Sequence, residues 1–216
     1  MTRILLIGGT GLIGGLLADR LSEAGGYEVH ALVRRPTGRR WAEHVAPPEQ
    51  WPEIARRTGG EIAISALGTT MRAAGSRPAF RAVDHGMVVA FAGAAREAGA
   101  RHMIAVSSAG ADPASRYFYL RTKGETEQAL AALAFDRLDI VRPGLLRGPR
   151  GGDRRPGERL AILLSPLANL FLRGPLDRYA AIDAAEVADA AAWLAMQEDP
   201  GVFRHHNRDL ARMARG

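Results

Sequence analysis

Residues 3–14 read RILLIGGTGLIG, in which a short apolar run stops abruptly at a cluster of glycines. The apolar run predicts a buried strand, and apolar residues at helical spacing from Leu12 to Ala24 predict the helix that follows. A strand, a tight glycine turn and a helix in this order are typical of a dinucleotide-binding unit. This stretch therefore indicates both the class of fold and the place where a nucleotide would bind.

The glycines fit GxxGxxG from Gly8, with Gly11 and Gly14, and they also fit GxGxxG from the next residue. In such units the first glycine allows the tight turn, the second lets the backbone approach a pyrophosphate, and the third lets the helix pack closely on the strand. The alternative is that the glycines serve only a sharp turn between strand and helix. The remaining candidate phosphate contacts are the Thr10 hydroxyl and the helix-start amides, including those of Leu12 and Ile13.

Further short apolar runs alternate with helical patterns along the chain. The runs cover residues 27–33, 61–67, 102–106 and 138–141, and the helical patterns cover 47–57, 80–98, 116–134 and 184–197. Short, continuous apolar strands separated by helices predict parallel pairing through right-handed crossovers. We therefore expect one α/β domain over residues 1–216, built on a doubly wound parallel sheet of the Rossmann type. The regular pattern fades in the later part of the chain, where we expect residues 145–180 to form a small substrate or lid segment.

Composition argues against several functions. The chain has no cysteine, which excludes disulfides and cysteine nucleophiles. Its net charge of +6 comes from scattered arginines without interleaved aromatic residues, so we expect no nucleic-acid partner. The histidines lack metal-site spacing, so we expect no metal site, and no apolar stretch is long enough to span a bilayer. The chain starts directly with its first strand and not with a signal peptide, which predicts a cytoplasmic protein.

The second predicted strand ends at Arg34 and Arg35, where the choice of cofactor is usually decided. NAD-binding sites carry an acidic residue here, about 20 residues beyond the glycines, to hold the ribose 2′-hydroxyl. A 2′-phosphate instead needs guanidinium partners and no carboxylate nearby. The two arginines therefore predict NADP(H) as the cofactor; the alternative is that they are merely solvated.

The chain has 28 arginines and a single lysine, Lys123, which lies four residues after Tyr119. On a helix this spacing puts both side chains on one face, about one turn apart. An ammonium group beside a phenol stabilises the phenolate, so Tyr119 is a candidate proton donor and acceptor. Ser107 and Ser108 end the preceding strand at the same edge of the sheet. One of their hydroxyls can hold a substrate carbonyl there, or cap a following turn.

These segments together resemble the short-chain dehydrogenase/reductase superfamily, whose hallmark is a glycine-rich nucleotide turn, a serine and a YxxxK pair. The likeness covers nearly the whole chain and is closer to the atypical or extended type than to the classical type. Four segments resemble the Tat-interacting-protein oxidoreductase branch in particular: ALGTT at 66–70, SSAGAD at 107–112, YLRTKGE at 119–125 and RPG at 142–144. In this order, the four segments are specific.

The resemblance implies an NADP(H) site in which Tyr119 is the acid and base. Lys123 binds the nicotinamide ribose and tunes the tyrosine, while Ser107 or Ser108 orients the substrate. The further cofactor contacts that the resemblance implies are Pro143 and Gly144 beside the nicotinamide, and Leu67 and Gly68 near the adenosine. Asp84 departs from the pattern, because many extended members have asparagine there.

We therefore expect an NADPH-dependent oxidoreductase that moves a hydride to or from a small carbonyl or alcohol substrate, as a monomer or a homodimer. The short region after Gly148 disfavours an epimerase or dehydratase acting on a nucleotide sugar. The alternative is an NADPH-binding sensor or scaffold protein with little or no turnover, because fold alone does not decide function.

Overall fold

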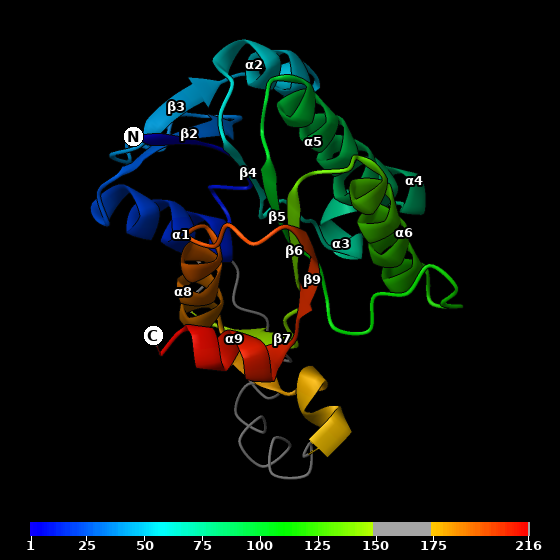
Figure 1. Ribbon diagram of the computed structural model, residues 1–216. Coiled ribbons are helices and arrows are strands. Elements are labelled where there is room, and N and C mark those ends of the chain that lie inside the picture. Colours follow the sequence, from blue (N-terminus) through cyan, green and yellow to red (C-terminus); the bar gives the residue numbers. More distant parts are fainter. Residues whose placement is uncertain (149–173, 216) are drawn as a thin grey trace.

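The computed structural model describes residues 1–148 and 174–215, and its centre is a seven-stranded sheet (Figure 1). Its strands are β1 (Thr2–Ile7), β2 (Tyr27–Val33), β3 (Ala42–Val45), β4 (Ile62–Ser65), β5 (His102–Val106), β6 (Arg137–Val141) and β9 (Gly201–His205). They lie in the order β3-β2-β1-β4-β5-β6-β9, and every neighbouring pair is parallel. The strand order reverses between β1 and β4, as in a doubly wound sheet. The predicted Rossmann fold is therefore confirmed.

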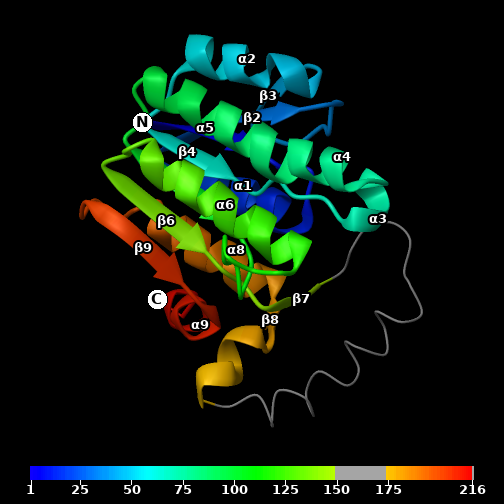
Figure 2. The same ribbon diagram turned by 90° about the vertical axis from the view of Figure 1, so that its right-hand side faces the viewer.

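Helices cover both faces of the sheet (Figure 2). One face carries α1 (Leu12–Glu23), α8 (Ala184–Leu194) and α9 (Asn207–Met213), and the other carries α2 (Trp51–Thr58), α5 (Val88–Glu97) and α6 (Phe118–Ala132). The shorter helical elements are η1 (Pro48–Gln50), α3 (Met71–Ala74), α4 (Arg77–Arg81), the π-helical turn η2 (Ala82–Met87) and η3 (Gly174–Tyr179). Elements α4, η2 and α5 follow one another directly, so the helix predicted at 80–98 is present with a π-helical turn inside it.

The first strand shows why the sequence forms three layers. Ile4, Leu5, Leu6 and Ile7 are all completely buried. Successive side chains of a strand point to opposite faces, so Ile4 and Leu6 pack with the layer of α1 and α8. Leu5 and Ile7 pack with the layer of α2 and α5. Because both faces are covered, the strand is apolar throughout and does not alternate with polar residues, and each buried side chain contributes about 1.5–3 kcal/mol.

Two strands of the sheet, β3 and β9, lie outside the predicted set. Both are edge strands, and parts of both remain exposed, so neither has the continuous apolar run of the central strands. A separate two-stranded parallel sheet joins β7 (Leu145–Arg147) to β8 (Ala181–Asp183). The two strands of this small sheet lie at the beginning and just after the end of the expected substrate or lid segment, most of which lies outside the described residues. Across the described ranges, no helix is long and apolar enough to cross a membrane.

Candidate functional site

The turn between β1 and α1 requires glycine at two positions for steric reasons. Gly8 has a φ of +85°, and a Cβ there would overlap the backbone of Ala66 in the loop after β4. A Cβ on Gly14 would overlap the carbonyl oxygen of Gly8, so this glycine lets helix and strand approach closely. At Gly11 an added Cβ would lie 3.2 Å from the same oxygen and near no other protein atom. Space is therefore left open at the position predicted to face a pyrophosphate.

The start of α1 is suited to an anion. The helix begins at Leu12, and its N-cap, Gly11, provides no side chain to cap the first amides. No acidic residue lies in the first turn, so nothing there neutralises the positive end of the helix dipole. Backbone amides at such a position bind phosphate groups. Of the predicted contacts, the amides of Leu12, Ile13 and Gly14 thus fit a pyrophosphate.

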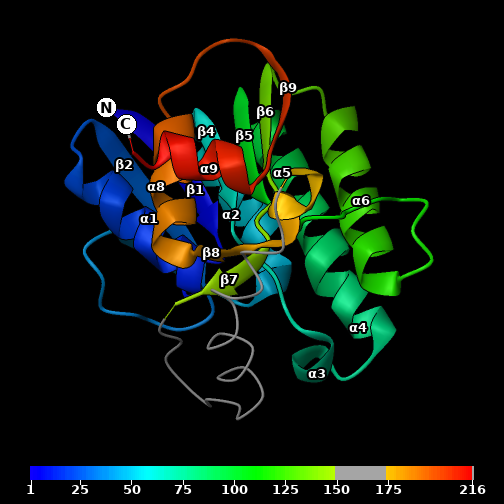
Figure 3. The ribbon, with the colours of Figure 1, turned by 90° about the horizontal axis from the view of Figure 1, so that it is seen from below.

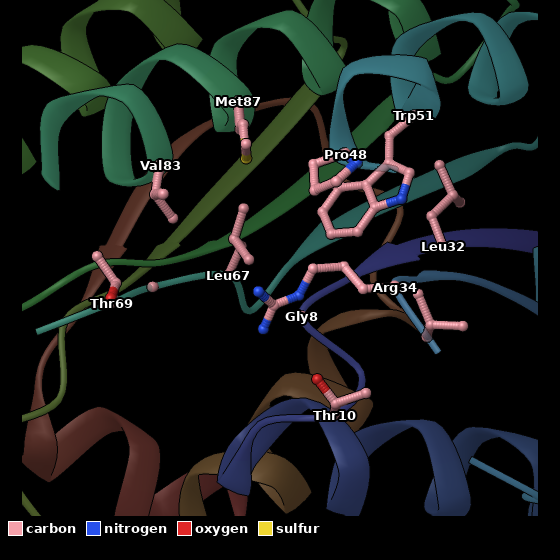
Figure 4. Close-up of a pocket in the computed structure, with 12 residues that line it drawn as sticks. Gly8, Thr10, Leu32, Arg34, Pro48, Trp51, Leu67, Thr69, Val83 and Met87 are labelled. Atoms are coloured by element: carbon pink, nitrogen blue, oxygen red, sulfur yellow. The ribbon is translucent and has the colours of Figure 1, made fainter. Parts of the chain in front are cut away.

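A pocket of about 160 Å³ opens beside this turn, between β1, β2, β4 and α2 (Figure 4). Its lining comprises Gly8, Thr10, Leu32, Val33, Arg34, Pro48, Trp51, Leu67, Gly68, Thr69, Val83 and Met87. The Arg34 side chain extends into the pocket, with the rings of Pro48 and Trp51 on one side and Thr10 on the other. The structure thus brings Gly8, Thr10, Arg34, Leu67 and Gly68 together, as expected. Arg35 is exposed and lies outside this lining.

Seven residues of this lining were missed from the sequence: Leu32, Val33, Pro48, Trp51, Thr69, Val83 and Met87. Leu32 and Val33 end β2, Pro48 and Trp51 begin η1 and α2, Thr69 follows β4, and Val83 and Met87 lie on the π-helical turn. Thr69 falls within the ALGTT segment, but no motif marks the others as contacts, because folding brings them to the glycine turn. A proline-tryptophan pair close to a nucleotide turn is the one usable signal, since flat apolar surfaces suit an adenine ring. Trp51 also belongs to the core, and its indole N–H donates to the Ala46 carbonyl at 3.1 Å.

Lys123 is buried on α6 beside the pocket. Its Nζ lies 2.7 Å from Oδ1 of Asp84, and the two side chains are only 8% and 1% exposed. The other oxygen of Asp84 accepts a hydrogen bond from the Thr69 amide at 2.8 Å. A Cβ added to Gly68 would lie 3.5 Å from Oδ1 and 3.8 Å from Nζ, so glycine leaves this ion pair accessible from the loop after β4. Asp84 is thus a site residue, although in the sequence it stands out only because many extended members have asparagine there.

Tyr119 lies at the start of the same helix, one turn before Lys123. Its side chain is 38% exposed, and its ring lies 5.7 Å from the ring of Phe80 in α4. Phe80 is fully buried and holds one edge of the tyrosine against the protein. The other part of the ring faces solvent, where a substrate can reach it.

The two candidate serines differ in how their hydroxyls are used. Ser107 donates to the buried Glu127, which also binds the guanidinium of Arg142. Among the residues that the structure describes, Ser108 donates to the carbonyl of the next residue alone, at a long 3.3 Å. Its hydroxyl is therefore the easier of the two to redirect to a ligand.

The loops after β5 and β6 are joined, which brings the serines close to the expected nicotinamide side. The Ala109 amide donates to the Pro143 carbonyl at 2.9 Å, and the Ser107 amide donates to the Val141 carbonyl at 2.7 Å. Gly144 follows directly. Within residues 1–148 and 174–215, no three acidic, histidine or cysteine side chains are grouped so as to hold a metal ion.

Comparison with known families agrees with this geometry. Residues 8–161 match the model of a family described as NAD(P)H-binding. The chain belongs to this NAD(P)H-binding family. The expected likeness to the atypical short-chain dehydrogenase/reductases is therefore confirmed at the level of an NAD(P)-binding Rossmann domain. The matched range includes the glycine turn, Arg34, Lys123 and Gly144.

Relatives similar over most of the chain carry one name. "Protein FMP52, mitochondrial" from Coccidioides immitis is 35% identical in an alignment 208 residues long that covers 88% of this chain and 84% of the relative. The protein of that name from Eremothecium gossypii is 34% identical in an alignment 206 residues long that covers 93% of this chain and 91% of the relative. These names contradict the expected cytoplasmic location, and that expectation was wrong. It rested on a search for a secretory signal, which does not distinguish the cytoplasm from a mitochondrion.

Solved structures confirm the fold. A UDP-glucose 4-epimerase from Thermotoga maritima, solved with UDP-glucose, has a TM-score of 0.70 and 18% identity and covers 94% of this chain and 76% of its own. The UDP-glucose 4-epimerase of Thermus thermophilus in complex with NAD has a TM-score of 0.68 and 19% identity, covering 98% and 82%. At such low identity the likeness supports the fold alone.

Proposed function

We propose that this protein is an NADP(H)-dependent oxidoreductase acting on a small carbonyl or alcohol substrate. The observation that carries the proposal is the position of Lys123, buried against Asp84 and beside Gly68. Gly68 also lines the nucleotide pocket, so the tyrosine-lysine helix borders the cofactor site. A residue pair suited to proton transfer thus lies close to a site suited to a dinucleotide.

The residues around the turn fit a dinucleotide with a 2′-phosphate. The first-turn amides of α1 would hold the pyrophosphate, and Leu67 with Gly68 would border the adenosine. Arg34 would bind the 2′-phosphate, because its guanidinium reaches into the pocket from the end of β2. Pro143 and Gly144 would lie beside the nicotinamide. When bound, the nicotinamide ring would supply or accept the hydride.

The side chains of the protein would handle the proton and orient the substrate. Tyr119 would give its hydroxyl proton to the developing alkoxide, or take a proton from an alcohol in the reverse direction. Lys123 would bind the ribose hydroxyls and stabilise negative charge on the phenol oxygen. Ser108, whose hydroxyl is weakly engaged, would donate to the substrate oxygen, while Ser107 would keep the Glu127 contact.

Replacement of Tyr119 by phenylalanine tests the enzymatic role. We expect turnover on a carbonyl panel to fall about 10²- to 10⁴-fold while NADPH affinity is retained, because only the proton-transferring hydroxyl is removed. Tyr117→Phe is the matched control, since this tyrosine lies two residues away, is 61% exposed and should leave turnover unchanged. Undiminished turnover in Tyr119→Phe would reject the catalytic assignment. NADPH binding by the wild-type protein without turnover of any substrate would favour a sensor.

The two neighbouring arginines test the cofactor preference. Arg34→Ala should weaken NADPH binding by about 10- to 100-fold, the usual cost of losing hydrogen bonds to a charged group, and leave NADH affinity unchanged. Arg35→Ala should change neither, since this residue lies outside the pocket. Both affinities follow from titration of reduced-nicotinamide fluorescence. Equal effects of the two substitutions would contradict a specific role for Arg34.

A further inference from the structure

The side chain of Asn207, at the start of α9, joins three backbone groups from two other segments of the chain. Its Oδ1 accepts a hydrogen bond from the Gly144 amide at 2.8 Å. Its Nδ2 donates to the carbonyls of Ala180, at 2.7 Å, and Asp177, at 3.1 Å. The residue is only 8% exposed. Every donor of the amide and its acceptor oxygen are therefore engaged.

The groups joined in this way belong to the two loops that face the reacting end of the proposed site. Gly144 follows β6, on the expected nicotinamide side. Asp177 lies in η3 and Ala180 lies between η3 and β8, at the end of the segment expected to face the substrate. The backbones also touch directly, because a Cβ on Gly144 would overlap the Ala180 carbonyl oxygen. Figure 3 shows α9 beside β7 and β8, where these loops meet.

The same segment also contacts the loop after β5, through Tyr179. A Cβ on Gly110 would lie 3.3 Å from Cε1 of Tyr179 and 3.6 Å from a methyl carbon of Leu120. The tyrosine ring therefore packs on the loop that follows Ser108, next to the first turn of α6. Residues 177–180 thus contact both the serine loop and the loop of Gly144.

We propose that Asn207 is a positioning residue that holds residues 177–180 on the Pro143–Gly144 loop and thereby shapes the nicotinamide half of the cofactor site. The inference rests on the proposed function. An amide is required at this position. The Gly144 amide needs an acceptor and the carbonyls of Asp177 and Ala180 need two donors, and one short side chain has to provide all three. Aspartate has the same shape but lacks the donors, and its charge would face two carbonyl oxygens.

Two ligands separate this role from a general structural one. NADPH occupies both halves of the site, whereas 2′-phospho-ADP-ribose lacks the nicotinamide ring and occupies the adenosine half, the pyrophosphate position and the place of the second ribose. Asn207→Asp should weaken NADPH binding by about 10-fold or more, because loss of the buried hydrogen bonds leaves the loop in its binding position only part of the time, and should leave the affinity for the fragment within about twofold. Calorimetric titration measures both. Arg212→Ala, on the same helix and 79% exposed at its side chain, is the control and should change neither.

The outcomes distinguish the two proposals. Equal weakening of both ligands, or of neither, in Asn207→Asp would overturn the positioning role while NADPH binding by the wild type still supports the proposed function. Failure of the wild-type protein to bind NADPH would reject the proposed function and this inference together. If Asn207→Asp does not fold, Asn207→Ala removes the two donors and also the acceptor of the Gly144 amide, adds no charge and gives the same comparison.

Discussion

Two buried charged clusters in this molecule are built in opposite ways. In the sheet, Asp139 on β6 is completely buried and accepts hydrogen bonds from His102 and His205, each at 2.7 Å. It also accepts two from Arg137, at 2.6 and 3.0 Å. At the candidate site, by contrast, Lys123 has one charged partner within residues 1–148 and 174–215, Asp84.

The difference lies in which polar groups remain available. A carboxylate has about four acceptor positions, and Asp139 uses four, so nothing is left for a ligand. Arg137 is similarly engaged, since it also donates to the Asp199 carbonyl at 2.7 Å and stacks 4.4 Å from the Phe203 ring centre. An ammonium has three donors, and among the described residues Asp84 is the one partner of Lys123. We call the cluster around Asp139 saturated, because its hydrogen-bonding positions are filled, and the Lys123–Asp84 cluster unsaturated, because donors of the ammonium remain free of charged partners there. The saturated cluster stabilises the fold, whereas the unsaturated cluster keeps donors available for a ligand.

The largest expected effect comes from breaking the saturated cluster. Asp139→Ala should lower the free energy of unfolding by about 3–5 kcal/mol, because it leaves the buried Arg137 guanidinium without its counter-charge. NADPH affinity of the remaining folded protein should not change. Chemical denaturation and cofactor titration measure the two quantities.

Asp136→Ala is the control for this substitution. Asp136 pairs with Arg101 at the protein surface, where the two side chains are 39% and 77% exposed. Solvent weakens such a pair, so its loss should cost far less stability than the loss of Asp139. A similar loss in both variants would contradict the structural role of the buried cluster.

The next effect concerns the unsaturated cluster and the lone lysine. Lys123→Arg keeps the charge but places a planar fork where a compact ammonium fits between Asp84 and the Gly68 loop. We expect turnover to fall about 100-fold through misplacement of the reacting groups, and the fold to persist. Steady-state kinetics and a thermal melt measure these. Arg101→Lys, in the exposed pair with Asp136, should leave turnover and thermal stability unchanged. Wild-type turnover in Lys123→Arg would mean that the site needs a positive charge at this position and not lysine itself.

Part of the fold and part of the candidate site could be predicted from the sequence. The central strands were predicted because burial on both faces leaves continuous apolar runs, of which residues 4–7 are the clearest. The glycine turn was predicted because backbone geometry forces glycine at Gly8 and Gly14. Arg34 and Lys123 were predicted because each is an unusual residue at a position with a known chemical demand.

The remainder depends on contacts between residues far apart in the chain. Asn207 is 63 residues from Gly144, and Asp139 is 66 residues from His205, so no local spacing links either pair. Trp51 lines the pocket with Gly8 only because folding brings the start of α2 close to the glycine turn. Asp84 is the instructive intermediate case. Its departure from asparagine was visible in the sequence, but its ion pair with Lys123 was not.

The smallest expected effect is the pH dependence of stability, which reports on the saturated cluster alone. Burial acts to raise the pKa of Asp139, but hydrogen bonds from His102, His205 and Arg137 outweigh it and hold this pKa well below its usual range. In the unfolded chain the carboxylate titrates near its ordinary value of about 3.9. The unfolded state therefore takes up the proton first, so the stabilisation is present above about pH 4 and is lost as the pH falls further.

Asp139→Asn should reduce this acid sensitivity. Denaturation curves between pH 5 and pH 2 should show the free energy of unfolding falling less steeply than in the wild type, by up to about 1.4 kcal/mol per pH unit, the contribution of one proton. Asp136→Asn should keep most of the wild-type slope, because solvent already weakens the interaction of that exposed carboxylate with Arg101. An unchanged slope in Asp139→Asn would place the acid-sensitive groups elsewhere. The saturated cluster would then stabilise the fold through packing and hydrogen bonds that do not depend on its charge.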